Sequence, residues 1–253
     1  PDSGLIVGTA YNDSLNTRGF ATWHGASVKE TVLGQGTEKT VSALATDSDG
    51  TIYAGTRKGL YSYSTSGWKL FSSPKHLPIT SFPNAKKFFI DKMGVHWLVN
   101  NDNILKYDGI DTKLIPIPQT YPERFIQDMK LDDAGRIWLG TNNGVMRYDG
   151  KEWIIYGRKE GFDLDYAFNT SGVVEIAIEA MGKVWAVSPE FPYWFDGNKW
   201  NKYSNFILEN IPAREIGSMT FSPNGTAWFG ALTYSYFTFF SDNMELLFPY
   251  PYS

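Results

Sequence analysis

Three features of the sequence predict an all-β protein, a six-bladed β-propeller of four-stranded antiparallel blades. An aromatic-centred motif returns in steps of 41 to 47 residues along the 253-residue chain. Each repeat holds four strand-like runs, and 24 Gly and 13 Pro supply turns between them. No helical period interrupts the pattern, so four antiparallel strands in each repeat describe one propeller blade. We therefore expect residues 1–253 to form a single propeller domain.

The repeat joins an apolar strand, an acidic or polar turn that ends in Gly, and a strand with an aromatic residue near its centre. Five turns follow this pattern: Asp47–Gly50, Asp91–Gly94, Asp132–Gly135, Glu179–Gly182 and Ser222–Gly225. The aromatic residues that follow them are Tyr53, Trp97, Trp138, Trp185 and Trp228. A single repeat of this size cannot bury both of its faces, so we expect neighbouring blades to pack their aromatic side chains against one another.

Residues 125–156 show the four strands of one blade most clearly. The strand-like runs are 125–131, 137–141, 145–148 and 153–156. Between the third and the fourth run lies Asp149-Gly150, a tight-hairpin signal that other repeats carry as Asp108-Gly109 and Asp196-Gly197. Gly supplies the positive φ that such hairpins require. A β-sandwich or a solenoid is the alternative architecture for this pattern.

The first copy of the repeat is incomplete. Leu5–Thr9 matches only the second half of the unit, so we expect the first blade to lack its inner strand. That strand either lies in an upstream segment or is replaced by the C-terminal segment, and residues 248–253 should be extended because they contain two Pro. The chain starts without an initiator Met or a signal peptide, and we expect an export signal to have been removed.

Composition excludes several classes of function. Cys is absent, which excludes disulfides, zinc–thiolate sites, iron–sulfur clusters and thiol catalysis. The net charge of −4 argues against a general nucleic-acid or anionic-membrane binder. No apolar run is long enough for a membrane-spanning helix. We expect no cofactor, no metal, no nucleic-acid partner and no membrane span.

The repeat unit resembles the two-component regulator propeller repeat. Residues 40–63 and 126–150 carry the resemblance best, and it continues in weakened form over nearly the whole chain. In the second of these ranges the matching residues are Asp132, Gly135, Trp138, Gly140, Thr141, Gly144, Tyr148 and Asp149. The resemblance implies a periplasmic sensor region like those of bacterial hybrid histidine kinases, which are often linked to glycan sensing. The motif residues build the blade, so they say little about a ligand.

Ligand-binding residues are expected at one end of the blades, which we call the long-loop face. The connections from each outermost strand to the next innermost strand lie there, together with the turns between second and third strands. Long and dissimilar loops usually carry binding residues. Aromatic rings beside Asn and Arg suit sugars, because the ring stacks on the sugar and the polar groups bind its hydroxyls. The candidates are Tyr11, Asn12, Arg18, Arg57, Asn101, Tyr121, Arg124, Asn142, Tyr166, Tyr193 and Tyr234.

Two other interpretations apply to the same residues. Tyr, Trp and Arg are also typical anchors of protein–protein interfaces, so a protein-interaction scaffold is the alternative function. The aromatic side chains could instead cover the blade ends and pack there without any ligand.

A second candidate group follows the inner strands. Four residues before each acidic turn, the sequence has Ala43, Lys87, Asp128, Glu175 and Ser218. Period 2 places this column on the same side of each inner strand, facing the central channel or the seams beside it. Charges there are costly unless they are paired or hydrated. Lys87, Asp128, Glu175 and Ser218 therefore form either a set of paired charges around a wet channel or a site for a polar ligand or cation.

The sequence gives no sign of a catalytic centre. It lacks the glycine-rich phosphate loops, the nucleophile elbow and the zinc-protease motif. His24, His76 and His96 lie in different slots of the repeat, and each is expected to be structural. A lyase or hydrolase is the third hypothesis, and it would need Asp128, Glu175 and Lys87 to meet at the channel mouth. We predict a non-catalytic, exported, sensor-like recognition module, periplasmic or extracellular, that binds a glycan or another small polar ligand.

Overall fold

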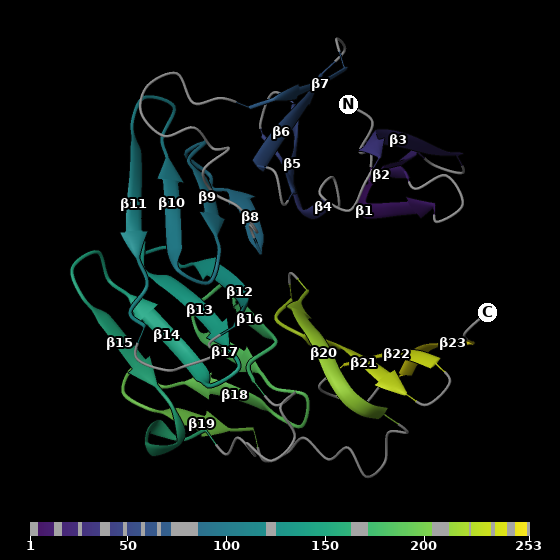
Figure 1. Ribbon diagram of the computed structural model, residues 1–253. Helices are drawn as coiled ribbons and strands as arrows, with labels where there is room; N and C mark the ends of the chain where they lie inside the picture. Colours follow the sequence, from purple (N-terminus) through teal and green to yellow (C-terminus); the bar gives the residue numbers. More distant parts are fainter. Residues whose placement is uncertain are drawn as a thin grey trace. The chain divides into compact units, whose positions relative to one another are not determined.

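The computed structural model describes fourteen stretches of the chain and divides into two compact units, residues 1–119 and 120–253. The described residues are 5–12, 17–24, 27–35, 41–47, 50–56, 59–64, 67–71, 86–119, 125–162, 172–203, 213–222, 224–233, 236–241 and 246–251. They form six antiparallel sheets, one of three strands and five of four strands (Figure 1). That the sheets belong to a single six-bladed domain stays a prediction.

The first unit contains the three-stranded sheet and two four-stranded sheets. The three-stranded sheet holds β1 (Leu5–Asn12), β2 (Thr17–His24) and β3 (Ser27–Gln35). The second sheet holds β4 (Val41–Thr46), β5 (Ile52–Thr56), β6 (Gly59–Ser64) and β7 (Gly67–Leu70). The third holds β8 (Lys87–Ile90), β9 (His96–Val99), β10 (Asn103–Tyr107) and β11 (Thr112–Pro116). In every sheet the strands lie side by side in chain order.

The described residues of the second unit form three four-stranded sheets and a short 3-10 helix. The first sheet holds β12 (Ile126–Leu131), β13 (Ile137–Thr141), β14 (Gly144–Tyr148) and β15 (Trp153–Tyr156), followed by η3 (Arg158–Glu160). The next holds β16 (Glu175–Ile178), β17 (Val184–Val187), β18 (Pro192–Phe195) and β19 (Trp200–Lys202). The last holds β20 (Ala213–Phe221), β21 (Ala227–Thr233), β22 (Tyr236–Ser241) and β23 (Leu246–Pro251).

The all-β fold of four-stranded antiparallel blades is confirmed, and its first sheet has only three strands, as the incomplete first repeat predicts. The C-terminal segment is extended as far as Pro251. It pairs with β22 in its own sheet, so the alternative that it replaces the missing strand of the first blade is wrong. Among the described residues, the structure has no helix with the length and hydropathy needed to cross a membrane.

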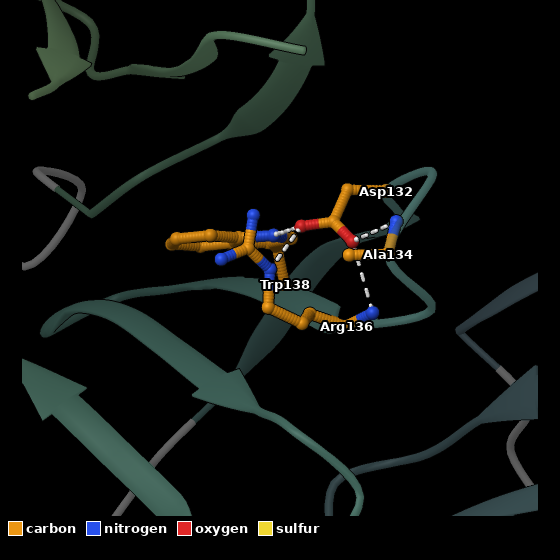
Figure 2. Close-up of polar contacts among 4 residues, drawn as sticks. All are labelled: Asp132, Ala134, Arg136 and Trp138. Atoms are coloured by element: carbon orange, nitrogen blue, oxygen red, sulfur yellow. Dashed lines mark hydrogen bonds and ion pairs between the residues drawn. The ribbon is translucent and has the colours of Figure 1, made fainter. Parts of the chain in front are cut away.

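The acidic turns are held by the carboxylate that opens each of them. In the β12–β13 turn, Asp132 Oδ1 accepts the backbone N–H groups of Ala134 (3.0 Å) and Arg136 (2.9 Å). Its Oδ2 accepts the indole N–H of Trp138 at 2.8 Å (Figure 2). The same bond joins Asp91 to Trp97 (2.9 Å), Glu179 to Trp185 (2.5 Å) and Asp47 to the Tyr53 hydroxyl (3.1 Å). The repeat motif therefore ties each of these four turns to the aromatic residue of the following strand.

Sheets that follow one another within a unit pack through their aromatic side chains. Trp138 of β13 and Trp200 of β19 are 0% and 2% exposed, and their rings meet edge to face at 6.0 Å. The cluster that they share also contains Val145, Tyr156, Phe162, Val173, Ile176, Val184, Ala186, Tyr193 and Phe195. A second cluster joins the β16–β19 and β20–β23 sheets through Trp185, Val187, Ile216, Met219 and Phe229. The β16–β19 sheet thus buries both of its faces, as a propeller blade must.

Candidate functional site

One end of the β12–β15 sheet brings together three connections that are distant in sequence. The β13–β14 turn contains Asn142, whose Oδ1 accepts the N–H of Phe125 at 2.9 Å while its own N–H donates to the Phe125 carbonyl at 3.3 Å. The N–H of Val173, just before β16, donates to Thr141 O at 2.8 Å. The β13–β14 turn and the starts of the inner strands β12 and β16 therefore lie at the same end of the sheet. This is the arrangement expected for the long-loop face.

Phe125 is the most exposed large aromatic side chain of this end among the described residues. Its side chain is 52% exposed, whereas the next residue, Ile126, is 3% exposed and lies in the core. Both backbone polar groups of Phe125 are bonded to Asn142, so the backbone that carries the ring is fixed. An exposed aromatic ring on a fixed backbone can stack on the apolar face of a sugar.

Polar residues lie at the same end of the sheet as this ring. Asn143 follows Asn142 in the turn and is half-buried, and its N–H donates to Thr141 Oγ1 at 3.1 Å. Among the described residues the carboxamide of Asn143 makes no hydrogen bond. Arg158 and Lys159 are exposed on η3, which follows β15 at the same end of the sheet. The end of this sheet thus offers an aromatic face, an amide and two cationic side chains.

The structure assigns Asn142 a positioning role. It belongs to the candidate ligand-binding residues, but its carboxamide oxygen caps the start of β12. Phe125 was not among the candidates, because the apolar pattern assigns it to the strand that begins there. Its position in the sequence could have identified it. Phe125 lies between the end of the long loop and the first buried residue of the strand, where no neighbouring strand covers an apolar side chain.

Tyr193 lies in the core and not on a binding surface. It is 0% exposed on β18, and its ring centroid is 4.9 Å from that of Phe162. It pairs with Ala186 of β17, which is also 0% exposed. The proline-rich segment around Tyr193 was predicted to be a loop. In the structure β18 already begins at Pro192, and the alternation of side chains along the strand points Tyr193 into the cluster that contains Trp138. Its assignment to the ligand-binding face is therefore corrected.

The other candidates of the long-loop face are only partly described. Asn101 is half-buried in the β9–β10 turn of the first unit, where Asn100 Oδ1 accepts the N–H groups of Asp102 and Asn103. Tyr11 on β1 pairs with Arg18 on β2, and Asn12 pairs with Thr17, but their side chains are outside the described part. Five further candidates lie outside the described residues: Arg57, Tyr121, Arg124, Tyr166 and Tyr234.

The column of inner-strand residues joins one sheet to the next in the second unit. Asp128 on β12 is 3% exposed, and its Oδ2 accepts the backbone N–H of Ile176 on β16 at 2.9 Å. Glu175 on β16 repeats the contact, because its Oε2 accepts the N–H of Met219 on β20 at 3.0 Å. An inner strand has an open edge whose N–H groups lack a ladder partner. The two carboxylates satisfy one such N–H on each following strand.

The remaining members of the column do not repeat this bond. Ser218 on β20 is exposed, and Lys87 on β8 of the first unit is half-buried. Asp128 also forms an ion pair with Lys130, whose Nζ lies 3.9 Å from Asp128 Oδ2. In the described ranges of the chain, no group of three or more His, Asp or Glu side chains is arranged to hold a metal ion.

Replacing Asp128 tests whether the inner-strand carboxylates hold sheets together. We expect Asp128→Ala to lower the free energy of unfolding by about 2 kcal/mol, because a buried N–H on Ile176 loses a charged acceptor. Asp128→Asn keeps an acceptor oxygen and should lose about half as much. Urea unfolding of both variants measures the difference. Equal losses would show that the carboxylate charge, and not the bond to Ile176, is what matters.

Comparison with known protein families identifies the repeat to which the β12–β13 turn belongs. Residues 120–143, which include the Asp132–Trp138 turn and β13, match the family described as two component regulator propeller. The chain contains a two component regulator propeller repeat. The resemblance found in the sequence is thereby confirmed. Among curated proteins, no relative was found by sequence.

Solved structures show the same fold at low identity. The extracellular domains of the hybrid two component systems BT4673 and BT3049 from B. thetaiotaomicron align with TM-scores of 0.61 and 0.59, at 14% and 18% identity. The alignments cover 91% and 93% of this chain but only 31% and 32% of those chains. Virginiamycin B lyase from Staphylococcus aureus aligns with a TM-score of 0.65 at 14% identity, covering 99% of this chain and 89% of that chain. These likenesses establish the propeller fold of the repeat-containing chain.

Proposed function

We propose that this chain is a non-catalytic, sensor-like recognition module that binds a glycan or another small polar ligand on its long-loop face. The observation that carries the proposal is Phe125, a 52% exposed aromatic ring whose backbone is held by Asn142. At the same end of the sheet lies Asn143, whose carboxamide makes no hydrogen bond among the described residues. Rings of this kind stack on sugars, and amides bind sugar hydroxyls as donors and acceptors.

The cellular setting belongs to the same proposal. The repeat family and the two hybrid-system domains support a sensor-like role on the outer side of a membrane. We place the chain in the periplasm or outside the cell. The lyases share the fold, but one fold supports many functions, so their activity is not carried over to this chain.

A binding screen with a matched pair of variants tests the proposal. We expect a saturable oligosaccharide ligand in a glycan-array and thermal-shift screen, and at least about tenfold weaker binding by Phe125→Ala, since stacking is worth about 1 kcal/mol or more. The screen should contain neutral and uronic-acid oligosaccharides, because Arg158 and Lys159 are exposed at the same end of the sheet.

The control is Leu114→Ala, which removes a 43% exposed apolar side chain from β11 in the other unit. It should bind like the unchanged protein. A ligand that binds equally well to Phe125→Ala would move the site away from this end of the sheet. No ligand in either class of glycan would overturn the glycan part of the proposal and favour a protein partner, since an exposed Phe is also a typical interface anchor.

A further inference from the structure

His96 occupies a position that other repeats fill with an aliphatic residue. It is the residue before the motif aromatic Trp97, and the corresponding residues elsewhere are Ile52, Ile137, Val184 and Ala227. Ile137 and Val184 are 2% and 3% exposed, and His96 is buried almost as deeply at 6%. A titratable ring therefore stands in an apolar slot of the blade.

Aromatic rings from two sheets surround the imidazole. Tyr53 of β5 lies 4.7 Å from it between ring centroids, and Phe71, which follows β7, lies at 5.6 Å. Phe88 of β8 and Tyr107 of β10 each lie at 5.7 Å. The first two rings belong to the β4–β7 sheet, and the other two belong to the sheet of His96 itself. The imidazole thus packs at the contact between two neighbouring sheets of the first unit.

The buried ring lacks an acceptor for a second proton. Its Nδ1 is buried and has no hydrogen-bond partner in the part of the chain that the structure describes. The charged groups of that part that act on the ring are the carboxylates of Asp47 and Asp91. Both are engaged, because Asp47 Oδ2 accepts the Tyr53 hydroxyl and Asp91 Oδ2 accepts the Trp97 indole N–H.

Among the described residues, the other titratable groups that contact His96 are Tyr53 and Tyr107. The hydroxyl of Tyr53 donates to Asp47, and that of Tyr107 donates to the Gly109 carbonyl at 2.9 Å. Burial lowers the pKa of His96, and this effect outweighs the opposing influence of Asp47 and Asp91. The neutral imidazole is therefore the form that fits the folded protein at pH 7 and above.

We propose that His96 makes the contact between the β4–β7 and β8–β11 sheets pH-sensitive, so that mild acidification loosens it. A charged imidazole in this cage of rings is poorly solvated, and the charged acceptors described around it, Asp47 and Asp91, already accept hydrogen bonds from Tyr53 and Trp97. Protonation draws one of these carboxylates toward the imidazole and away from its present partner. This change disturbs the acidic turn that the carboxylate holds. Protonation is thus coupled to the turn motif of the blade.

The direction of the pH dependence follows from linkage. In the unfolded chain the pKa of His is about 6.5, and in the folded protein the pKa of His96 is lower. At pH values between these two pKa values, the unfolded state therefore binds more protons than the folded state. The contribution of His96 to stability is complete above about pH 6.5 and is lost as the pH falls through the folded pKa.

Three forms of the protein separate His96 from the other histidines. We expect the urea midpoint of the unchanged protein to fall between pH 7.5 and pH 5.5. The double variant His24→Gln/His76→Gln should show the same fall. In His96→Ile, which restores the residue type of the other repeats, the fall should be much smaller. The protection factors of amides in β5 and β9, which correct for the slower intrinsic exchange at low pH, should fall at pH 5.5 only in the two forms that retain His96.

Two results would overturn the proposal. One is an equal pH dependence in His96→Ile and the unchanged protein. The other is an NMR titration of the His96 ring in the unchanged protein with a pKa at or above 6.5, a measurement that does not depend on whether the variant folds.

Discussion

Asp132→Ala is expected to lower the free energy of unfolding by about 3 kcal/mol or more, one of the two largest effects that we predict for a single side chain. The carboxylate is 7% exposed and holds four donors. Among them, the indole N–H of Trp138 is fully buried and would be left without an acceptor (Figure 2). Each buried donor that loses its acceptor costs about 1–3 kcal/mol.

The charge of Asp132 adds to this effect. Arg136 Nε lies 2.7 Å from Asp132 Oδ2, and the guanidinium carbon of Arg136 lies 5.7 Å from the Trp138 ring centroid. Burial alone would raise the pKa of Asp132, but the hydrogen bonds from Trp138 and Arg136 outweigh it and hold the pKa below the usual value. The ionised form is thus the one that the turn stabilises, and an alanine removes a charge that the fold has already paired.

The neighbouring carboxylate provides the control. Asp133 is exposed in the same turn, and Asp133→Ala should change the free energy of unfolding by no more than about 0.5 kcal/mol. Urea denaturation of both variants measures the contrast. A loss for Asp132→Ala as small as that for Asp133→Ala would mean that the bond to Trp138 contributes nothing to the blade.

The strands could be predicted from the sequence because turn chemistry repeats. Asp or Glu opens four of the five turns, Ser222 opens the fifth, and Gly closes all of them, which fixes where one strand ends and the next begins. The predicted runs 137–141 and 153–156 coincide with β13 and β15. The differences are at strand starts, where β12 begins one residue later than predicted and β14 one residue earlier.

The site was harder to predict, because it depends on which strand lies beside which. Tyr193 is an aromatic residue in a proline-rich segment, and only the start of β18 at Pro192 turns it into the core. Asp128 is a charged residue on an inner strand, and its role appears only when the N–H of Ile176, 48 residues away, is placed beside it. Composition and period carry no information on such pairings between repeats.

Gly144→Ala is expected to cost about 3 kcal/mol or more, from two separate causes. Gly144 has a φ of +110°, which L side chains rarely adopt, and this strain costs about 1–3 kcal/mol. A Cβ atom there would also lie 2.2 Å from the carbonyl oxygen of Tyr156. Because that oxygen belongs to the backbone of β15, the strand itself must move, and overpacking of this kind costs about 1–3 kcal/mol.

Gly150→Ala separates the two causes. Gly150 has a φ of +98°, but a Cβ atom there would have no neighbour within 4 Å, so only the backbone strain applies. The difference between the two variants in urea unfolding should therefore measure the close approach of β14 to β15, and equal losses would exclude it. Gly144 also ends the turn that carries Asn142 and Asn143. Gly144→Ala should thus weaken ligand binding at the Phe125 end of the sheet, whereas Gly150→Ala, at the opposite end, should leave it unchanged.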